Sequence, residues 1–89
     1  MPLHIACQMD PIDSIDVPGD STLALLLAAQ DRGHKIFYYT PSDLSLRDGR
    51  LLARGATLTV RDEPGNHFNL ANHRVVDLGD LDVVLLRQD

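Results

Sequence analysis

The pattern of apolar and polar residues over the first forty positions predicts a strand, a loop, a helix and a second strand. Residues 3–8 are a short, mostly apolar run, and residues 34–40 are rich in aromatic side chains, as is typical of buried strands. Residues 20–32 contain neither Gly nor Pro, and Gly33 follows where a helix usually ends. Such a unit makes a right-handed crossover, so we expect an α/β fold with a mainly parallel sheet.

The predicted helix is apolar around most of its circumference, because residues 23–29 are all Leu or Ala. A helix that is apolar nearly all round is buried on more than one side. We therefore expect a second domain or another subunit to cover it, and hence a homo-oligomer. The run is far shorter than the ~20 apolar residues that span a bilayer, so no membrane partner is expected.

The middle of the chain predicts a β-hairpin inserted into this sheet. Asp48-Gly49 separates residues 44–47 from residues 50–54, and an Asp-Gly pair in this position favours a type I′ turn. The alternation of apolar and polar residues continues over residues 57–61, which indicates a further stretch of half-buried strand.

The last third of the chain predicts a long loop and one final strand. Residues 62–73 are polar and contain a Pro-Gly pair and three Asn, which is typical of a loop with at most one short helical turn. Residues 75–76 are a short strand or a lead-in, and residues 77–80 turn the chain. Residues 81–87 are a nearly continuous apolar run, as in a core strand. Since such a strand normally continues into a loop and helix, we expect the chain to be part of a larger protein.

Length and composition narrow the class of protein. The 89 residues suffice for one domain, which we expect to span residues 1–89. The net charge is -5, and the acidic residues are spread along the chain, which argues against a nucleic-acid partner. The single cysteine, Cys7, forms no internal disulfide, and no signal peptide is evident, so we expect a cytoplasmic protein. No cation is close to Cys7 in sequence, which favours a buried side chain over a reactive thiol.

The loop at residues 9–19 is the first candidate site, since ligands of open α/β sheets bind between a strand end and the amino end of a helix. It has one glycine and three acidic residues, so it lacks the G-x-G-x-x-G pattern and disfavours dinucleotide binding. A metal site at Asp10, Asp13 and Asp16 is an open alternative, although the spacing differs from that of calcium loops and no distal Glu follows.

Structural roles are favoured for the acidic residues at the two ends of this loop. Asp10 shapes a turn with the following proline, and Asp20 or Ser21 caps the helix. At the far end of the chain, Arg87 stands at the carboxyl tip of a predicted core strand. A charged residue in this position usually points toward a functional site. The residues support equally the alternative that Arg87 is simply an exposed charge at the end of a strand.

Two further groups of polar residues were weighed as sites. Four arginines could gather on one surface. We favour a solvated face that protects an exposed sheet edge from pairing with other chains. A patch that binds an anionic partner is the alternative. His67 and His73 have no Cys or acid at metal-ligand spacing, so we expect no zinc site. The arginines are Arg47, Arg50, Arg54 and Arg61.

Several short motifs, taken in order, resemble the N-terminal domain of bacterial glutathione synthetase. Met-Asp-Pro-Ile at residues 9–12 follows the first strand, Asp20-Ser21 opens the apolar helix, and Ala-Gln-Asp-Arg-Gly at residues 29–33 closes it. The remaining matches are Ser42-Asp43-Leu44, the Asp48-Gly49 hairpin and residues 80–89.

The resemblance covers the whole chain, and it is weakest over residues 62–73. Leu86 and Gln88 stand where the family usually has Met and Lys in a Leu-Met-Arg-Lys-Asp motif. The Pro-Pro-Phe-Asp continuation of that motif is missing from this sequence.

The resemblance implies a Rossmann-like pre-ATP-grasp domain of a ligase that joins γ-glutamylcysteine to glycine, with ATP and magnesium, through an acyl-phosphate. The nucleotide, the metal and the catalytic groups would lie in an ATP-grasp portion that this chain lacks, so we expect no catalytic residue and no metal site here. The domain would supply one wall of the substrate cleft, with Arg87 at the cleft edge. Met9, Asp10 and Ser21 would lie at the same edge of the sheet.

Two alternatives remain open at this point. The chain could be the N-terminal part of another ATP-grasp peptide ligase, or a stand-alone α/β interaction module with no enzyme attached. The open-ended final strand favours the two ligase interpretations. Under either of them, the isolated 89 residues are expected to be inactive.

Overall fold

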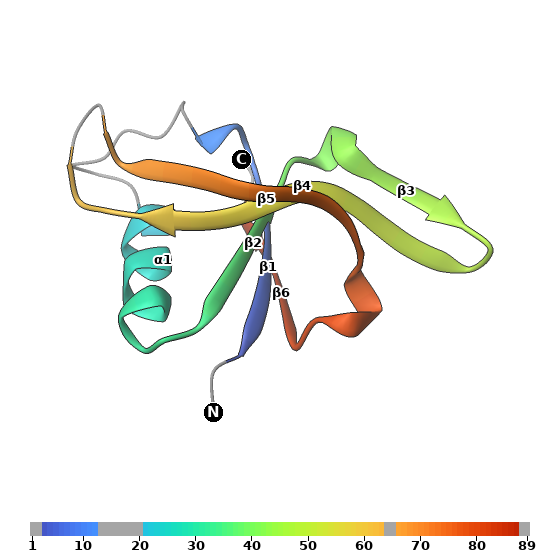
Figure 1. Cartoon of the computed structure of the whole chain (residues 1–89), viewed down its shortest axis with the longest axis horizontal. Coiled ribbons are helices and arrows are strands. Elements are labelled where there is room, and N and C mark those ends of the chain that lie inside the picture. The colour runs from blue at the N-terminus through green and yellow to red at the C-terminus, as the bar shows by residue number, and fades with distance from the viewer. Residues whose placement is uncertain (1–2, 13–20, 64–65, 88–89) are drawn as a thin grey trace.

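The computed structural model of the chain describes residues 3–12, 21–63 and 66–87. The described elements form a mixed six-stranded sheet with one α-helix packed against it (Figure 1). In chain order they are β1 (His4–Met9), α1 (Ser21–Asp31), β2 (Lys35–Tyr39), the 3-10 turn η3 (Pro41–Asp43), β3 (Leu44–Arg47), β4 (Arg50–Val60), β5 (Phe68–Asp77), the 3-10 turn η4 (Leu78–Asp80) and β6 (Val83–Arg87).

The first strand, the helix and the second strand form the parallel unit that the sequence predicts. β1 pairs in parallel with β2, with Ile5 opposite Ile36 and Cys7 opposite Tyr38. On its other side β1 pairs in parallel with β6. The predicted α/β fold is therefore confirmed.

The remaining strand pairs are antiparallel. β4 pairs in this way with β2, β3 and β5, and the strand order is β3–β4–β2–β1–β6, with β5 on β4 off this path. Figure 1 shows that β4 and β5 run at a steep angle to β1, β2 and β6, while the β3–β4 arm extends away from the side that α1 occupies. The sheet is mixed, so the expected predominance of parallel pairs is not confirmed.

The hairpin between β3 and β4 has the predicted turn. Asp48 has φ 51° and Gly49 has φ 78°, and a type I′ turn requires positive φ at both central residues. Arg47 and Arg50 flank the turn as register partners. Since few residues other than Asp, Asn and Gly tolerate this conformation, the dipeptide fixes the register of the arm.

The carboxyl end of α1 is closed by a Schellman motif at Gly33, as the sequence predicts. Gly33 has φ 82°, its N–H donates to the carbonyl of Gln30 at 2.9 Å, and the N–H of His34 donates to the carbonyl of Ala29 at 3.2 Å. The predicted cap at Asp20 lies outside the described residues.

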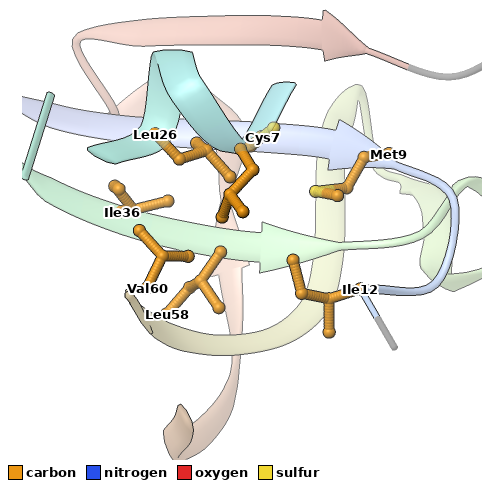
Figure 2. Packing of buried hydrophobic residues seen from close by; sticks show 8 residues of the cluster. Cys7, Met9, Ile12, Leu26, Ile36, Leu58 and Val60 are labelled. Carbon is orange, nitrogen blue, oxygen red and sulfur yellow. The ribbon is translucent and has the colours of Figure 1, made fainter. Parts of the chain in front are cut away.

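One side of α1 is fastened to the sheet. The side-chain amide of Gln30 donates to the carbonyl of Val60 at 2.9 Å and accepts from the N–H of Val60 at 2.8 Å. Figure 2 shows Leu26 of α1 above the side chains of Ile36, Leu58 and Val60, which lie on β2 and β4. A second apolar cluster that includes Ala6, Phe37, Tyr39, Ala53 and Leu78 lies on the helix-free face of the sheet.

The other side of α1 faces outward in the described part of the chain. Ala24, Leu25 and Ala28 are exposed, and 40% of Leu25 is accessible. A second domain or subunit over this face stays a prediction. No helix among the described residues has the length and apolar character that a membrane crossing requires.

The predicted loop over residues 62–73 is wrong for the second half of its length, because β5 begins at Phe68. Asn69, Ala71 and Arg74 are all paired with residues of β4, although most of the strand is exposed. Phe68 and Leu70 pack against the apolar cluster beneath α1, but the bulge at Asn72 interrupts the alternation beyond them, so the pattern of a half-buried strand is not continuous.

The last strand differs from the prediction in its position. β6 is shorter than predicted and lies at an edge of the described sheet, beside β1. Val84 is 41% exposed and Leu86 is 67% exposed. An apolar run alone does not distinguish a central strand from an edge strand. Within the described residues, β6 has a neighbouring strand on one side only.

Candidate functional site

The carboxyl ends of the three parallel strands form one edge of the sheet. Met9, the last residue of β1, is the register partner of Arg87, the last residue of β6. The amino end of α1 lies at the same edge, because the chain crosses over from the end of β1 to begin the helix. Strand ends and a helix terminus therefore meet here, as the resemblance to the ligase family implies.

Arg87 links the last strand to the first turn of α1. Its Nη2 donates to Ser21 Oγ at 3.1 Å, and its Nε donates to Thr22 Oγ1 at 3.3 Å. Among the described residues no carboxylate forms an ion pair with Arg87, and Nη1 has no acceptor. The guanidinium is thus a positioned cation whose Nη1 donors face no acceptor within residues 3–12, 21–63 and 66–87, which suits the planar oxygens of a carboxylate or a phosphate.

The other residues expected at this edge differ in what they offer. Ser21 is exposed and contacts Arg87 directly. Asp10 is exposed just beyond β1. Met9 is only 2% exposed and its side chain packs in the core beneath α1 (Figure 2), so it can present only its backbone to a ligand.

The metal-site alternative in the loop after β1 falls mostly outside the described residues, because Asp13 and Asp16 lie there. Over residues 3–12, 21–63 and 66–87, no group of three or more potential metal-ligating side chains occurs. His67 and His73 do not form a pair. His67 is buried against the loop after β1, and His73 is exposed on β5.

Two side chains hold the start of this loop: Tyr38, which the sequence did not single out, and His67, which was considered only as a zinc ligand. Tyr38 Oη accepts from the N–H of Ile12 at 3.0 Å. His67 Nε2 donates to the carbonyl of Ile12 at 2.7 Å, and the His67 ring is only 6% exposed. The alternation in β2 could have placed Tyr38 on this face, next to Ile36. No sequence signal pointed to His67, because its partner is 55 residues away.

The four arginines weighed as a surface patch do not gather in one place. Arg50 lies 3.9 Å from Asp77 in an ion pair, and Arg61 donates to Asn66 and to the carbonyl of Phe68. Arg47 and Arg54 alone share a pocket, on the hairpin arm. The structure therefore favours separate solvated arginines over a four-residue anion patch.

Cys7 is buried, as predicted, and its thiol is not reactive. The residue is fully inaccessible. Burial raises the pKa of the Cys7 thiol from 9.0 to about 11, although the positive charge of Arg87 acts in the opposite direction. At neutral pH the thiol is protonated, so it is a poor nucleophile.

The raised pKa of Cys7 predicts a loss of stability in alkali. Between pH 9 and 11 the unfolded chain gives up the thiol proton while the folded chain keeps it, so the unfolded state binds fewer protons and the free energy of unfolding falls as pH rises. A full two-unit difference corresponds to about 2–3 kcal/mol. Urea denaturation of the protein and of Cys7→Ala at pH 8 and at pH 10.5 is expected to show a smaller loss in the variant.

Tyr39 also contributes to the loss of stability in alkali, in the protein and in Cys7→Ala. Burial, and then the charge of Cys7, raise the pKa of the Tyr39 hydroxyl. Burial of Tyr39 therefore costs both proteins some stability in alkali, while the smaller contribution of Cys7 is absent from Cys7→Ala. Equal alkaline losses in the two proteins would contradict the assignment to Cys7.

Comparison with known proteins gives a consistent result. Residues 3–89 match the family model described as the prokaryotic glutathione synthetase N-terminal domain. The chain is similar to proteins named glutathione synthetase from Bradyrhizobium diazoefficiens (56% identical), Rhodopseudomonas palustris (55%) and Mesorhizobium japonicum (53%). Each match covers 100% of this chain and 28% of the relative, so the chain spans little more than a quarter of their length.

Proposed function

Because the chain belongs to the family of prokaryotic glutathione synthetase N-terminal domains, we propose that it forms the substrate-cleft domain of an ATP-dependent ligase that joins γ-glutamylcysteine to glycine. The observation that carries this proposal is the position of Arg87. It stands at the carboxyl edge of the parallel strands, and Ser21 and Thr22 hold its guanidinium in place.

The proposed role of Arg87 is to bind a carboxylate of the peptide substrate. Making an amide bond through an acyl-phosphate requires a carboxylate and a phosphoryl group, both anionic, to come together, and cations must offset their repulsion. A guanidinium with free Nη1 donors can hold a carboxylate without moving. Asp10 and Ser21, and the backbone of Met9, are proposed to line the same cleft.

ATP and magnesium are proposed to bind to the part of the enzyme that this chain does not include. The described residues offer no cluster of three potential metal ligands, and the sequence has no glycine-rich phosphate loop. The residues that the structure describes do not fit either group, so we assign them no step of phosphoryl transfer. Its contribution is to bind and orient the substrate that the rest of the enzyme activates.

The remaining features of the proposal concern the setting of the domain. The parallel unit β1–α1–β2 with β6 is proposed to be the Rossmann-like part of a pre-ATP-grasp domain, with residues 1–89 in one domain. The exposed apolar face of α1 at Ala24, Leu25 and Ala28 supports a contact with another domain or with a second subunit of a homo-oligomer. We propose that the enzyme acts in the cytoplasm.

The direct test is an assay for the reaction. The protein in the longest form that its gene encodes is expected to release ADP only when both γ-glutamylcysteine and glycine are present, with glutathione as the product. The isolated residues 1–89 are expected to release none. ADP release from the isolated residues, or a longer protein that ignores these two substrates, would contradict the proposal.

A further inference from the structure

A pocket that mixes apolar and basic side chains lies on the helix-free face of the sheet, at the amino ends of β1 and β2. It has a volume of about 420 Å³, within the usual range for small-molecule sites. The pocket lies at the end of the parallel strands opposite Arg87, since β1 runs from His4 to Met9. The side chains that matter here are those of His4, Lys35, Phe37, Thr57, Asn72 and Arg74.

A β-bulge directs Arg74 toward this pocket. The register between β4 and β5 shifts between Gly55, opposite Arg74, and Thr57, opposite Ala71, so β5 carries one extra residue. Asn72, within the bulge, has φ 55°, an uncommon conformation for a residue other than glycine. Bulges of this kind often re-aim a side chain near a functional site.

Three contacts then fix the guanidinium of Arg74. Its Nη1 donates to Thr57 Oγ1 at 3.0 Å and to the carbonyl of Asn72 at 2.7 Å. Its Cζ lies 5.1 Å from the centre of the Phe37 ring, where a cation is attracted to the ring face. Arg74 is exposed, and holding an exposed arginine in one geometry costs side-chain entropy.

The donors of Arg74 that point away from these contacts are unused. Nε and Nη2 have no acceptor among the described residues, and this pair is one of the two forks that bind carboxylate or phosphate oxygens. Lys35 lies on the same face, as the register partner of His4, and no carboxylate side chain lines the pocket. The fixed guanidinium of Arg74 and the exposed ammonium of Lys35, with no carboxylate side chain in the lining, make this pocket locally positive in a protein of net charge -5.

We propose that this pocket binds a small molecule with two oxyanion groups, phosphate or carboxylate, one on the Nε–Nη2 fork of Arg74 and the other at Lys35. The proposal goes beyond the function proposed above, because neither residue lies at the edge that carries Arg87. If Arg74 instead serves only to cover Phe37, its removal changes stability and leaves anion binding unaltered.

The test uses pyrophosphate and succinate as separate probes, titrated by calorimetry into the protein in the longest form that its gene encodes. We expect saturable binding of at least one probe. Binding of pyrophosphate alone identifies a phosphate-bearing ligand, and binding of succinate alone identifies a dicarboxylate. Arg74→Gln and Lys35→Gln are each expected to weaken binding about tenfold or more, the usual effect of losing a charged hydrogen bond.

Two controls make the outcome specific. Arg54→Gln removes the same charge from the hairpin arm, outside this pocket, and is expected to change affinity less than twofold. Arg74→Lys keeps the charge but loses the fork, so an intermediate affinity is expected. If neither probe binds saturably, if both glutamine variants at the pocket bind as the parent does, or if Arg54→Gln weakens binding equally, the proposal is overturned.

Discussion

In the proposed ligase, replacing Arg87 with methionine is expected to lower kcat/KM for γ-glutamylcysteine by about tenfold to a hundredfold, the usual effect of removing a charged hydrogen bond to a substrate. Methionine keeps much of the length and apolar volume of arginine, so the change removes mainly the charge and the donors. The measurement is steady-state kinetics in the longest form that the gene encodes. The loss should appear in KM for the peptide, with KM for ATP nearly unchanged.

The matched control for this prediction is Arg32→Met, which removes an exposed arginine just past the carboxyl end of α1, opposite the end where Ser21 contacts Arg87, and should leave the kinetics unchanged. A second variant separates position from charge. Ser21→Ala with Thr22→Val removes both acceptors of Arg87 and keeps the guanidinium, so we expect a smaller loss in the same parameter. Arg87→Met with normal kinetics, or an equal rise in KM for all three substrates, would remove Arg87 from the peptide site.

Replacing Gly55 with alanine is expected to lower the free energy of unfolding by about 3 kcal/mol or more, at the upper end of overpacking effects. An added Cβ would lie 2.0 Å from the carbonyl oxygen of Tyr38 and 2.9 Å from Cζ of Phe37. Neither neighbour can yield easily, because Tyr38 is paired with Ala56 across β2 and β4 and Phe37 packs in the second core cluster. Urea denaturation followed by circular dichroism measures the loss.

Gly49→Ala is the matched control, because it adds the same methyl group where nothing lies within 4 Å. Its cost arises from the positive φ of Gly49 alone, and about 1–2 kcal/mol is expected. A small domain is stable by roughly 5–15 kcal/mol, so the two variants should be clearly distinguishable. The close approach of β4 to β2 would be disproved if Gly55→Ala cost no more than Gly49→Ala.

The parts of the fold that the sequence predicted correctly are specified by neighbouring residues. Asp48-Gly49 defines its turn within four residues, because both positions need a positive φ. The turn at Gly33 closes α1 through two local bonds, from the N–H of Gly33 to the carbonyl of Gln30 and from the N–H of His34 to the carbonyl of Ala29. Such features can be inferred from a short window, since the residues that determine them are adjacent.

The parts that the sequence did not predict depend on distant residues. β5 takes its hydrogen bonds from β4, and the bulge at Asn72 breaks the alternation that begins at Phe68 and Leu70, so no short window of sequence reveals the strand. The position of Arg87 at a strand tip was predicted, but its contacts with Ser21 and Thr22 bridge more than sixty residues. His67 was considered only as a zinc ligand, while its actual partner is the backbone of Ile12.

The placement of β1 between β2 and β6 has a consequence for synthesis. β1 emerges from the ribosome before the other strands of the sheet. Its contacts on the β6 side form much later, since the N–H of His4 donates to Asp82, which lies 78 residues further along the chain. At the usual rate of about 5–20 residues per second, one border of β1 stays open for several seconds. β6 can therefore pair with β1 only after residues 83–87 have left the exit tunnel. A pause in translation before that point would prolong the time for which this side of β1 is exposed to chaperones.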